Sequence, residues 1–267
     1  MESSHWVSIN KAFSKQSIHF DQDDEANPVL QTWRKRVYHH VDQFVKPGSK
    51  ILELNAGTGI DAIHFAKQGH TVHATDLSDG MVAAINKKIV TQGLSNKISV
   101  QQLSFQDIHQ IKEKFDVVFS NFGGINCCDD LTKITKHLPL LLNSNALVIW
   151  VIMPRVAPWE WLWFFKGKFK MAFRRFSTQG VQAKLEGEVF TTFYYSLREI
   201  KNAFADHFEF LRSEALGAFS PPPGSERFIS NFPGALKGMN RLDHWLSNVF
   251  PFNRWGDHII VTFRFKK

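Results

Sequence analysis

Apolar side chains recur at helical spacing over residues 27–45, and Lys46-Pro47-Gly48 ends that segment. Short β-like runs then alternate with helical runs as far as residue 152. The predicted strands are 50–54, 71–75, 97–103, 116–120 and 146–152, and the predicted helices between them are 60–68, 79–91 and 129–142. Strands that alternate with helices build parallel sheets covered on both faces. The pattern therefore predicts an α/β fold with a doubly wound, mostly parallel sheet.

The alternation changes after residue 152. Residues 159–176 are crowded with aromatic and basic side chains, which predicts a helical or irregular cap inserted after the fifth strand. Ser196 and Glu199 have the spacing of a capping box at the start of a further helix. The elements predicted beyond the cap are a helix at 197–206, a strand at 208–216, an excursion that begins at 221–224 and a last strand at 258–266.

Composition adds two constraints on function. The formal charge of +7 suits an anionic partner, such as nucleic acid or an acidic membrane surface, but net charge does not define a fold. The 25 phenylalanines and 8 tryptophans are many for 267 residues, so the aromatic side chains need a place in the structure. Much of this excess falls in residues 159–176.

The two cysteines and the chain's apolar stretches bear on localisation. Cys127 and Cys128 are adjacent, a spacing that a disulfide rarely spans, so we expect reduced thiols and a cytoplasmic protein. The N-terminal residues lack a basic start followed by an apolar run, so no secretory signal is predicted. Proline and charged residues interrupt the most apolar stretch, 146–165, so no membrane-spanning segment is predicted.

The sharpest local motif is ILELNAGTGID at 51–61, between a predicted strand and a predicted helix. Its small residues let a ligand approach the backbone, and the following helix start offers free N–H groups. Together with Ala62, Gly57 and Gly59 also satisfy the dinucleotide fingerprint G-x-G-x-x-A. An NAD(P)-dependent oxidoreductase and a purely structural turn therefore remain alternatives at this stage.

Two acidic residues follow the next two strands. Asp76 ends the second strand, where a carboxylate can accept hydrogen bonds from both hydroxyls of a ribose. Asp107 follows the third strand and could accept the exocyclic amine of adenine, with Leu77 or Phe105 covering the ring. A solvated loop acid is the alternative for Asp107. The pair predicts a cofactor that contains a nucleoside.

Four motifs together resemble those of class I, Rossmann-like, S-adenosylmethionine-dependent methyltransferases. They are ELNAGTG, Asp76-Leu77-Ser78 with Met81, the Asp107 loop and FDVVFSNFGG at 115–124. The resemblance covers about residues 30–152 and the terminal strand pair, and it is greatest to the small-molecule group (type 11) that includes quinone methyltransferases. It implies S-adenosylmethionine as cofactor and a seven-stranded sheet with an antiparallel last strand.

The resemblance also implies which residues bind the cofactor. Glu53 and Gly57 would line the methionine pocket, and Asn121 with Phe122 would face the sulfonium. The full set of implied cofactor-binding residues is Glu53, Asn55, Ala56, Gly57, Gly59, Asp76, Leu77, Met81, Phe105, Asp107, Asn121 and Phe122. Asn55 departs from the small or Asp-like residue usual before the glycine-rich turn, and we expect the site to tolerate it.

Methyl transfer is a single in-line displacement that needs positioning and exclusion of water but no fixed catalytic dyad. The catalytic residues are therefore unknown. If the acceptor is a hydroxyl, a general base would help, and the candidates are His19, Tyr194, His244 and His258, with Tyr195 behind them. No metal site is predicted, because Asp129-Asp130 has the character of a helix start.

We expect a single domain over residues 1–267. Its four parts are an N-terminal lid and helix at 1–46, a cofactor-binding core at 47–152, the cap at 153–195 and a C-terminal helix and strand pair with an inserted excursion at 196–267. Within the first part, residues 10–28 are polar but carry Phe13, Ile18 and Phe20. This composition favours a mobile lid over the cofactor, with a disordered tail as the alternative.

The acceptor is expected to be a small molecule, apolar, aromatic or lipid-like. Residues 159–176 have the composition of an interfacial helix, so a peripheral contact with a membrane is one interpretation, and packing on the sheet is another. A nucleic-acid methyltransferase is not favoured, because NFGG at 121–124 lacks an N-P-P-Y type motif. A dehydrogenase is not favoured either, because no Tyr-x-x-x-Lys pair is found. The sequence does not define an oligomeric state.

Overall fold

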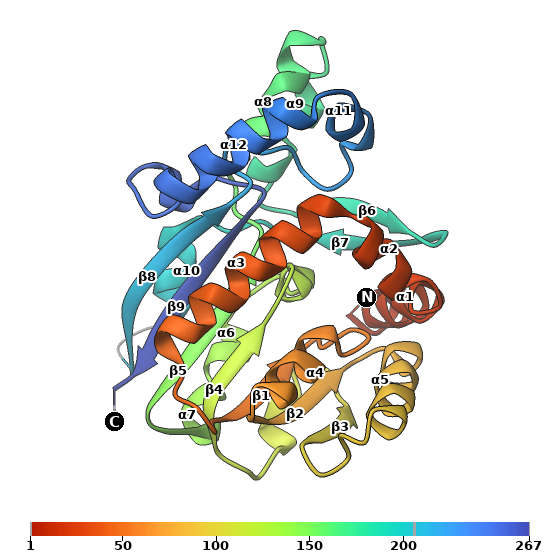
Figure 1. Ribbon diagram of the computed structural model, residues 1–267, viewed down its shortest axis with the longest axis vertical. Coiled ribbons are helices and arrows are strands. Elements are labelled where there is room, and N and C mark those ends of the chain that lie inside the picture. The colour runs from red at the N-terminus through yellow and green to blue at the C-terminus, as the bar shows by residue number, and fades with distance from the viewer. Residues whose placement is uncertain (1, 205–206, 267) are drawn as a thin grey trace.

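The computed structural model describes residues 2–204 and 207–266, and its centre is one seven-stranded sheet (Figure 1). The strands are β1 (Lys50–Leu54), β2 (Thr71–Asp76), β3 (Ile98–Gln102), β4 (Phe115–Ser120), β5 (Leu142–Ile152), β8 (Phe208–Leu216) and β9 (His258–Phe265). Their order is β3-β2-β1-β4-β5-β9-β8. Strands β1 to β5 are parallel, whereas β9 runs antiparallel to both β5 and β8. The predicted fold class is confirmed.

Helices cover both faces of this sheet, as a doubly wound fold requires. The helices of the N-terminal half are α1 (Glu2–Gln16), α2 (Phe20–Ala26), α3 (Pro28–Phe44), α4 (Ile60–Lys67) and α5 (Asp79–Thr91). Helix α3 begins where it does because the Asn27 side chain accepts hydrogen bonds from the N–H groups of Val29 and Leu30. The helices predicted at 27–45, 60–68 and 79–91 are confirmed.

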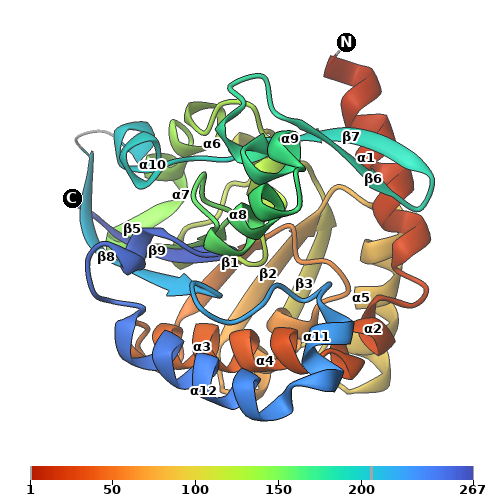
Figure 2. The ribbon, with the colours of Figure 1, turned by 90° about the horizontal axis from the view of Figure 1, so that it is seen from above.

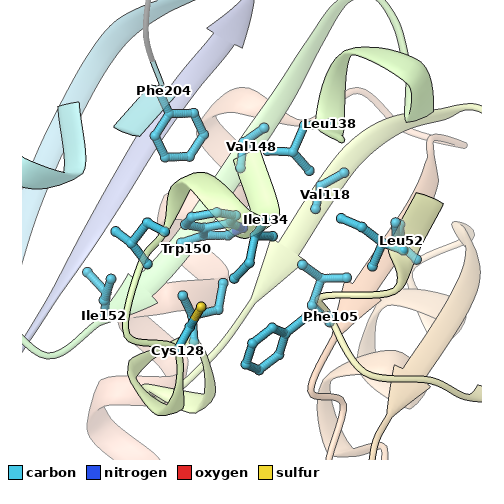
Figure 3. Packing of buried hydrophobic residues seen from close by; sticks show 14 of the residues in the cluster. Leu52, Phe105, Val118, Cys128, Ile134, Leu138, Val148, Trp150, Ile152 and Phe204 are labelled. Atoms are coloured by element: carbon cyan, nitrogen blue, oxygen red, sulfur yellow. The ribbon is translucent and has the colours of Figure 1, made fainter. Parts of the chain in front are cut away.

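The sheet separates two hydrophobic clusters. On one face, Trp150 packs against Phe204 with ring centroids 4.9 Å apart (Figure 3). Phe204 in turn stacks on Phe263 at 3.9 Å. On the other face, Trp33 and Phe65 are almost completely buried among residues of α3, α4 and the sheet. Central strands that are buried on both faces read as continuous apolar runs, which is why β1 and β5 were recognisable.

The helix predicted at 129–142 is wrong. This segment forms two single-turn helices, α6 (Thr132–Thr135) and α7 (Leu138–Leu141), and β5 already begins at Leu142. Pro139 cannot donate the backbone hydrogen bond that a continuous helix would need, so the chain starts again at α7. Leu142, which the prediction placed in the helix, is the first residue of β5, so the strand begins four residues before its predicted start at 146.

The cap contains both helices and a hairpin. Its helices are α8 (Pro158–Phe165) and α9 (Phe169–Ala172), and α10 (Leu197–Phe204) follows it. The hairpin of β6 (Val181–Leu185) and β7 (Glu188–Thr192) was not predicted. Its two-residue turn is Glu186-Gly187, and both residues have positive φ, as a tight hairpin requires. For the helix predicted at 197–206, residues 205 and 206 lie outside the described part of the chain.

The excursion between β8 and β9 is helical. It forms α11 (Glu226–Asn231) and α12 (Pro233–Leu246), and Figure 2 shows α12 on the same side of the sheet as α3 and α4. Within residues 2–204 and 207–266, no helix has both the length and the apolar character that crossing a bilayer would demand.

A substitution at Gly217, the residue that follows β8, can test how tightly α3 packs on the sheet. It has φ +69°, and a Cβ placed there would lie 2.3 Å from Cζ2 of the buried Trp33 ring. We predict that Gly217→Ala lowers the free energy of unfolding by about 3 kcal/mol or more, because strain adds to overpacking. Gly187→Ala is the matched control, since Gly187 has φ +81° but no heavy atom within 4 Å of the added Cβ. Urea unfolding curves measure the free energy of unfolding of both variants. Equal losses of this free energy in Gly217→Ala and Gly187→Ala would disprove the clash with Trp33.

Candidate functional site

A cavity of about 280 Å³ lies at the carboxyl ends of the parallel strands, under the N-terminal helices. Its polar floor is formed by the turn after β1, the end of β2, the loop after β4 and one side chain of α3. Its apolar wall comes from α1, the loop after β3 and strand β7. Ligands of open α/β folds bind at this end of the sheet, so this cavity is the candidate active site.

The glycine-rich turn and Asp76 are joined by backbone hydrogen bonds. The Gly57 N–H donates to Asp76 Oδ2, and the Ser78 N–H donates to Asp76 Oδ1, both at 2.8 Å. Gly57 has φ +58°, which a side chain would strain. Burial raises the pKa of Asp76 to about 6, although these N–H groups favour the ionised form. Asp76 also lines the cavity, so its remaining lone pairs can accept hydroxyl donors from a ligand.

Asn55 connects the glycine-rich turn to the loop after β4. It adopts φ +47°, and asparagine is one of the few residues with a side chain that do so readily. Its side chain accepts a hydrogen bond from Ser120 Oγ at 2.7 Å and donates one to the Asn121 carbonyl at 3.1 Å. A Cβ on Gly124 would lie 2.4 Å from this side chain. The departure at Asn55 is therefore part of a close contact between two site loops.

Arg34 of α3 is the centre of a buried ionic network at the cavity floor. Its guanidinium donates to Asp24 at 2.6 Å and to Asp61 at 2.5 Å, and all three side chains are nearly inaccessible to solvent. Asp61 also accepts hydrogen bonds from Tyr38 Oη at 2.7 Å and from the Asn121 amide at 2.9 Å. Burial opposes ionisation of Asp61, but Arg34 outweighs it and lowers the pKa of this carboxyl.

Glu53 lies at the end of β1, directly behind the turn. It is 1% exposed, and no described residue donates a hydrogen bond to its Oε2. Burial, with the charges of Asp61 and Asp76, raises the pKa of Glu53 well above its usual range, although Arg34 acts in the opposite direction. A buried acceptor without a partner is costly, so a cationic or N–H donor ligand at this position would be stabilised.

The N-terminal segment covers the cavity as two helices. Ser14 of α1 donates to Asp79 at 2.9 Å and lies 2.9 Å from Ser78 Oγ, which fixes α1 against the start of α5. Phe13 and Phe20 line the cavity, whereas Ile18 is 88% exposed. Two of the three predicted lid residues therefore face the site, and they do so from helices that sequence inspection did not predict.

The structure brings most of the predicted cofactor-binding residues to this cavity. Those that line it are Asn55, Ala56, Gly57, Asp76, Leu77, Met81, Phe105, Asn121 and Phe122. Glu53 and Gly59 lie behind the turn and do not line it. Asp107 precedes a short 3₁₀ helix and does not line it either, although its neighbours Ser104 and Phe105 do. Their cofactor contacts stay predictions.

Sequence inspection missed several residues of the cavity. Arg34 and Asp61 were not singled out, because a lone arginine or aspartate in a helix gives no local signal. The apolar wall was also largely missed, and its members beyond Phe105 include Trp6, Ile9, Leu103, Met153 and Phe190. These residues are distant along the chain, and only the folded structure gathers them.

The predicted general-base candidates do not line the cavity. His19 is half-buried and pairs with Asp23 and Glu186, and His244 is exposed on α12. Tyr194 packs under Arg175, with 4.7 Å between the guanidinium carbon and the ring centroid. His258 lies behind Phe122 with ring centroids 5.9 Å apart, and it pairs with Asp257. Their catalytic roles stay untested predictions.

Cys127 and Tyr195 are two further titratable residues near the site. Burial raises the pKa of the Cys127 thiol to about 12, so this cavity residue stays protonated near neutral pH. Tyr195 Oη donates a hydrogen bond to the Cys128 carbonyl and is held away from the cavity. In the described part of the chain, no cluster of three or more His, Cys, Asp or Glu side chains is arranged to hold a metal ion.

Comparison with known proteins agrees with this geometry. Residues 51–145 match the family profile of the methyltransferase domain. These residues form a methyltransferase domain. The resemblance to class I methyltransferases that the motifs indicated is confirmed.

The chain is also similar to curated relatives and to solved structures. A demethylmenaquinone methyltransferase of Corynebacterium glutamicum (strain R) is 33% identical over 124 residues, which are 42% of this chain and 50% of the relative. The chain thus spans about half the length of the curated relatives it matches. The 1,6-didemethyltoxoflavin-N1-methyltransferase of Burkholderia thailandensis, solved with S-adenosylhomocysteine bound, aligns with TM-score 0.57 at 13% identity, covering 98% of this chain and 88% of that one. The cyclase SpnF aligns with TM-score 0.63 at 10% identity, covering 97% and 95%.

The Arg34 network predicts a large stability effect. Arg34→Met leaves Asp24 and Asp61 as buried charges without their partner, so we expect a loss of about 3–5 kcal/mol in the free energy of unfolding. Lys35→Met is the control, because Lys35 is the exposed neighbour on α3 and its replacement should cost less than about 0.5 kcal/mol. Chemical denaturation of the two variants measures both values. A loss below about 1 kcal/mol for Arg34→Met would contradict the network's role.

Proposed function

We propose that this protein is an S-adenosylmethionine-dependent methyltransferase (EC 2.1.1.-) that moves a methyl group to a small acceptor. The observation that carries the proposal is Asp76, a buried carboxylate held by Gly57 and Ser78 at the end of β2 and open to the cavity. A carboxylate in this position is suited to the two hydroxyls of a ribose. The matched methyltransferase domain contains both the turn and this carboxylate.

The charges of the floor fit the cofactor's methionine end. S-adenosylmethionine carries an ammonium and a sulfonium, and Glu53 has a buried oxygen without a described donor close to Asp61 and Asp76. The ammonium would supply that missing donor. Arg34 lines the same floor, but its guanidinium is already paired with Asp24 and Asp61. The cofactor supplies an activated methyl group, and the protein positions the acceptor in line with it and excludes water.

A dedicated base is not part of this proposal. The described residues that line the cavity include no histidine, tyrosine or lysine, and Cys127 keeps its proton. Asp61 is held in the Arg34 network, and Asp76 is assigned to the ribose. The acceptor atom would therefore be nucleophilic without help or become so through the acceptor's own chemistry, and catalysis rests on orientation.

We infer that the acceptor is apolar, aromatic or lipid-like. Trp6, Ile9, Phe13, Phe190 and Met153 form a wall that offers contact to a planar or hydrocarbon group and few hydrogen-bond partners. The named relative that acts on demethylmenaquinone supports a hydrophobic acceptor. A lipid-like acceptor would be met at a membrane surface, which residues 159–176 are proposed to contact. We place the protein in the cytoplasm, on the basis of its adjacent reduced cysteines.

An NAD(P)-dependent oxidoreductase is the second candidate, because the turn satisfies the dinucleotide fingerprint. The strand order argues against it. The classic dinucleotide-binding sheet has six parallel strands in the order 3-2-1-4-5-6. Here the strand after β5 is β9, which runs antiparallel and lies between β5 and β8.

Calorimetric titration separates the two candidates. We expect S-adenosylmethionine and S-adenosylhomocysteine to bind and NAD(H) not to bind, after which phenols, quinones and lipids can be screened as acceptors. Asp76→Ala should abolish binding without unfolding the protein. Asp42→Ala, at an exposed acid of α3 that does not line the cavity, should retain it. Binding of NAD(H) alone, or unchanged affinity in Asp76→Ala, would disprove the assignment.

The pKa of Asp76 predicts how cofactor affinity depends on pH. Hydroxyl donors need the ionised carboxylate, and the pKa of Asp76 is raised from 3.8 to about 6. Affinity for S-adenosylhomocysteine should therefore rise by about tenfold in total as pH increases from 5, and it should level off above about pH 7. Asp76→Asn should remove this dependence. If the affinity of the unmodified protein did not change with pH, or if Asp76→Asn showed the same pH dependence, ionisation of Asp76 would not control cofactor binding.

A further inference from the structure

The cap carries an exposed apolar surface that the proposed active site does not use. We call it the cap tip and define it as residues 162–173, from α8 through α9. Phe165 is 82% exposed and Phe169 is 56% exposed, and the other exposed apolar members are Leu162, Phe164, Met171 and Phe173. Phe164 contacts Phe169 and Phe173 edge to face, so these rings form one patch. An exposed patch of this kind marks an interaction surface.

The cap tip is firmly attached to the domain. The buried Glu160 accepts hydrogen bonds from Arg174 at 2.7 and 2.8 Å and from Arg175 at 2.8 Å. Arg175 also pairs with Asp257, which precedes β9, at 2.7 Å. On α8, Trp159 Nε1 donates to the Phe219 carbonyl at 2.7 Å. The inner face of the cap is thus bound to the sheet and to the excursion, while the phenylalanines point outward.

Positive charge accompanies the exposed rings. Lys166, Lys168 and Lys170 are exposed in the same segment, and no acidic residue occurs from 161 to 185. Two of these lysines lie over the Trp163 ring, with ammonium-to-centroid distances of 5.0 and 4.9 Å. Aromatic side chains flanked by lysines are the composition of surfaces that bind anionic membranes, where rings enter the headgroup region and cations pair with phosphates.

The position of the cap tip suits such a contact. In Figure 1, α8 and α9 lie at the top of the molecule, toward which the carboxyl ends of the parallel strands point. Figure 2, viewed from that side, shows α8 and α9 in front of the sheet. A surface that touched the cap tip would therefore meet the same end of the domain as the cavity.

We propose that the cap tip docks the protein on a bilayer that contains anionic phospholipids. A second copy of this chain is a poorer occupant, because a symmetric pairing of the cap tips would place Lys166, Lys168 and Lys170 of one copy against those of the other. An anionic bilayer matches both the rings and the charge. This docking deepens the membrane contact proposed above for residues 159–176 by naming the surface and its lipid, and it does not depend on methyl transfer.

Co-sedimentation with lipid vesicles tests the proposal. The full-length protein is mixed with vesicles of phosphatidylcholine alone and of phosphatidylcholine with phosphatidylglycerol, at low and high salt. We expect sedimentation with the mixed vesicles, weakened by salt and by removal of phosphatidylglycerol. Phe165→Ser with Phe169→Ser should reduce the partition coefficient about tenfold or more. Lys166→Glu with Lys168→Glu should reduce it by at least about fivefold for each charge.

Val90→Ser is the matched control, because Val90 is a 73% exposed apolar residue of α5, outside the cap. It should bind vesicles as the unmodified protein does. Calorimetric binding of S-adenosylhomocysteine reports that each variant is folded, and vesicle binding without cofactor binding would contradict the proposed function while leaving docking intact.

Three results would overturn the docking proposal. One is the absence of sedimentation with either vesicle, and a second is sedimentation that the cap-tip variants do not change. The third is a dimer of the unmodified protein in sedimentation velocity that Phe165→Ser with Phe169→Ser converts to monomer, which would assign the cap tip to a second copy.

Discussion

The pairing of Arg34 with Asp24 and Asp61 is the interaction on which the architecture of the site depends. It joins α2, α3 and α4 at one buried point, where Arg34 of α3 pairs with Asp24 of α2 and Asp61 of α4. Through Asn121, Asp61 also holds the loop after β4. Buried charges of this kind contribute specificity of arrangement more than net stability, since their desolvation offsets much of their attraction. The lid, the glycine-rich turn and the β4 loop are therefore fixed relative to one another.

The sequence predicts what is encoded locally. The strand, glycine turn and helix at 50–67 combine an apolar run, small residues and a periodic helix, so both the fold class and the turn were predicted correctly. Arg34 could not be predicted as a site residue, because its partner Asp61 is 27 positions away and only the packing of α3 brings them together. The error at 129–142 has a local cause, since Pro139 interrupts the helix and the apolar side chain of Leu142 fits a helix end as well as the start of a buried strand.

The polar floor and the apolar wall of the cavity come from different parts of the chain. Similarity to relatives therefore gives less information about the acceptor than about the cofactor. The polar floor is built largely from residues 51–145, the part that matches the methyltransferase domain. The apolar wall includes Trp6, Phe13, Met153 and Phe190, all outside that range. Because the acceptor would contact the wall, its identity is set by segments that the match does not cover.

Fold alone does not define the reaction, and the cyclase SpnF has a similar fold. The charges of the cavity floor distinguish between cofactors better than the fold does. A dinucleotide would bring a pyrophosphate with two negative charges to the start of α4, beside the ionised Asp61. Arg34, the cation at this floor, is already paired with two carboxylates. Like charges brought together in this way cost several kcal/mol, whereas a ligand with a net positive charge is attracted. The electrostatics of the floor thus favour a sulfonium cofactor over a nicotinamide dinucleotide, independently of any sequence resemblance.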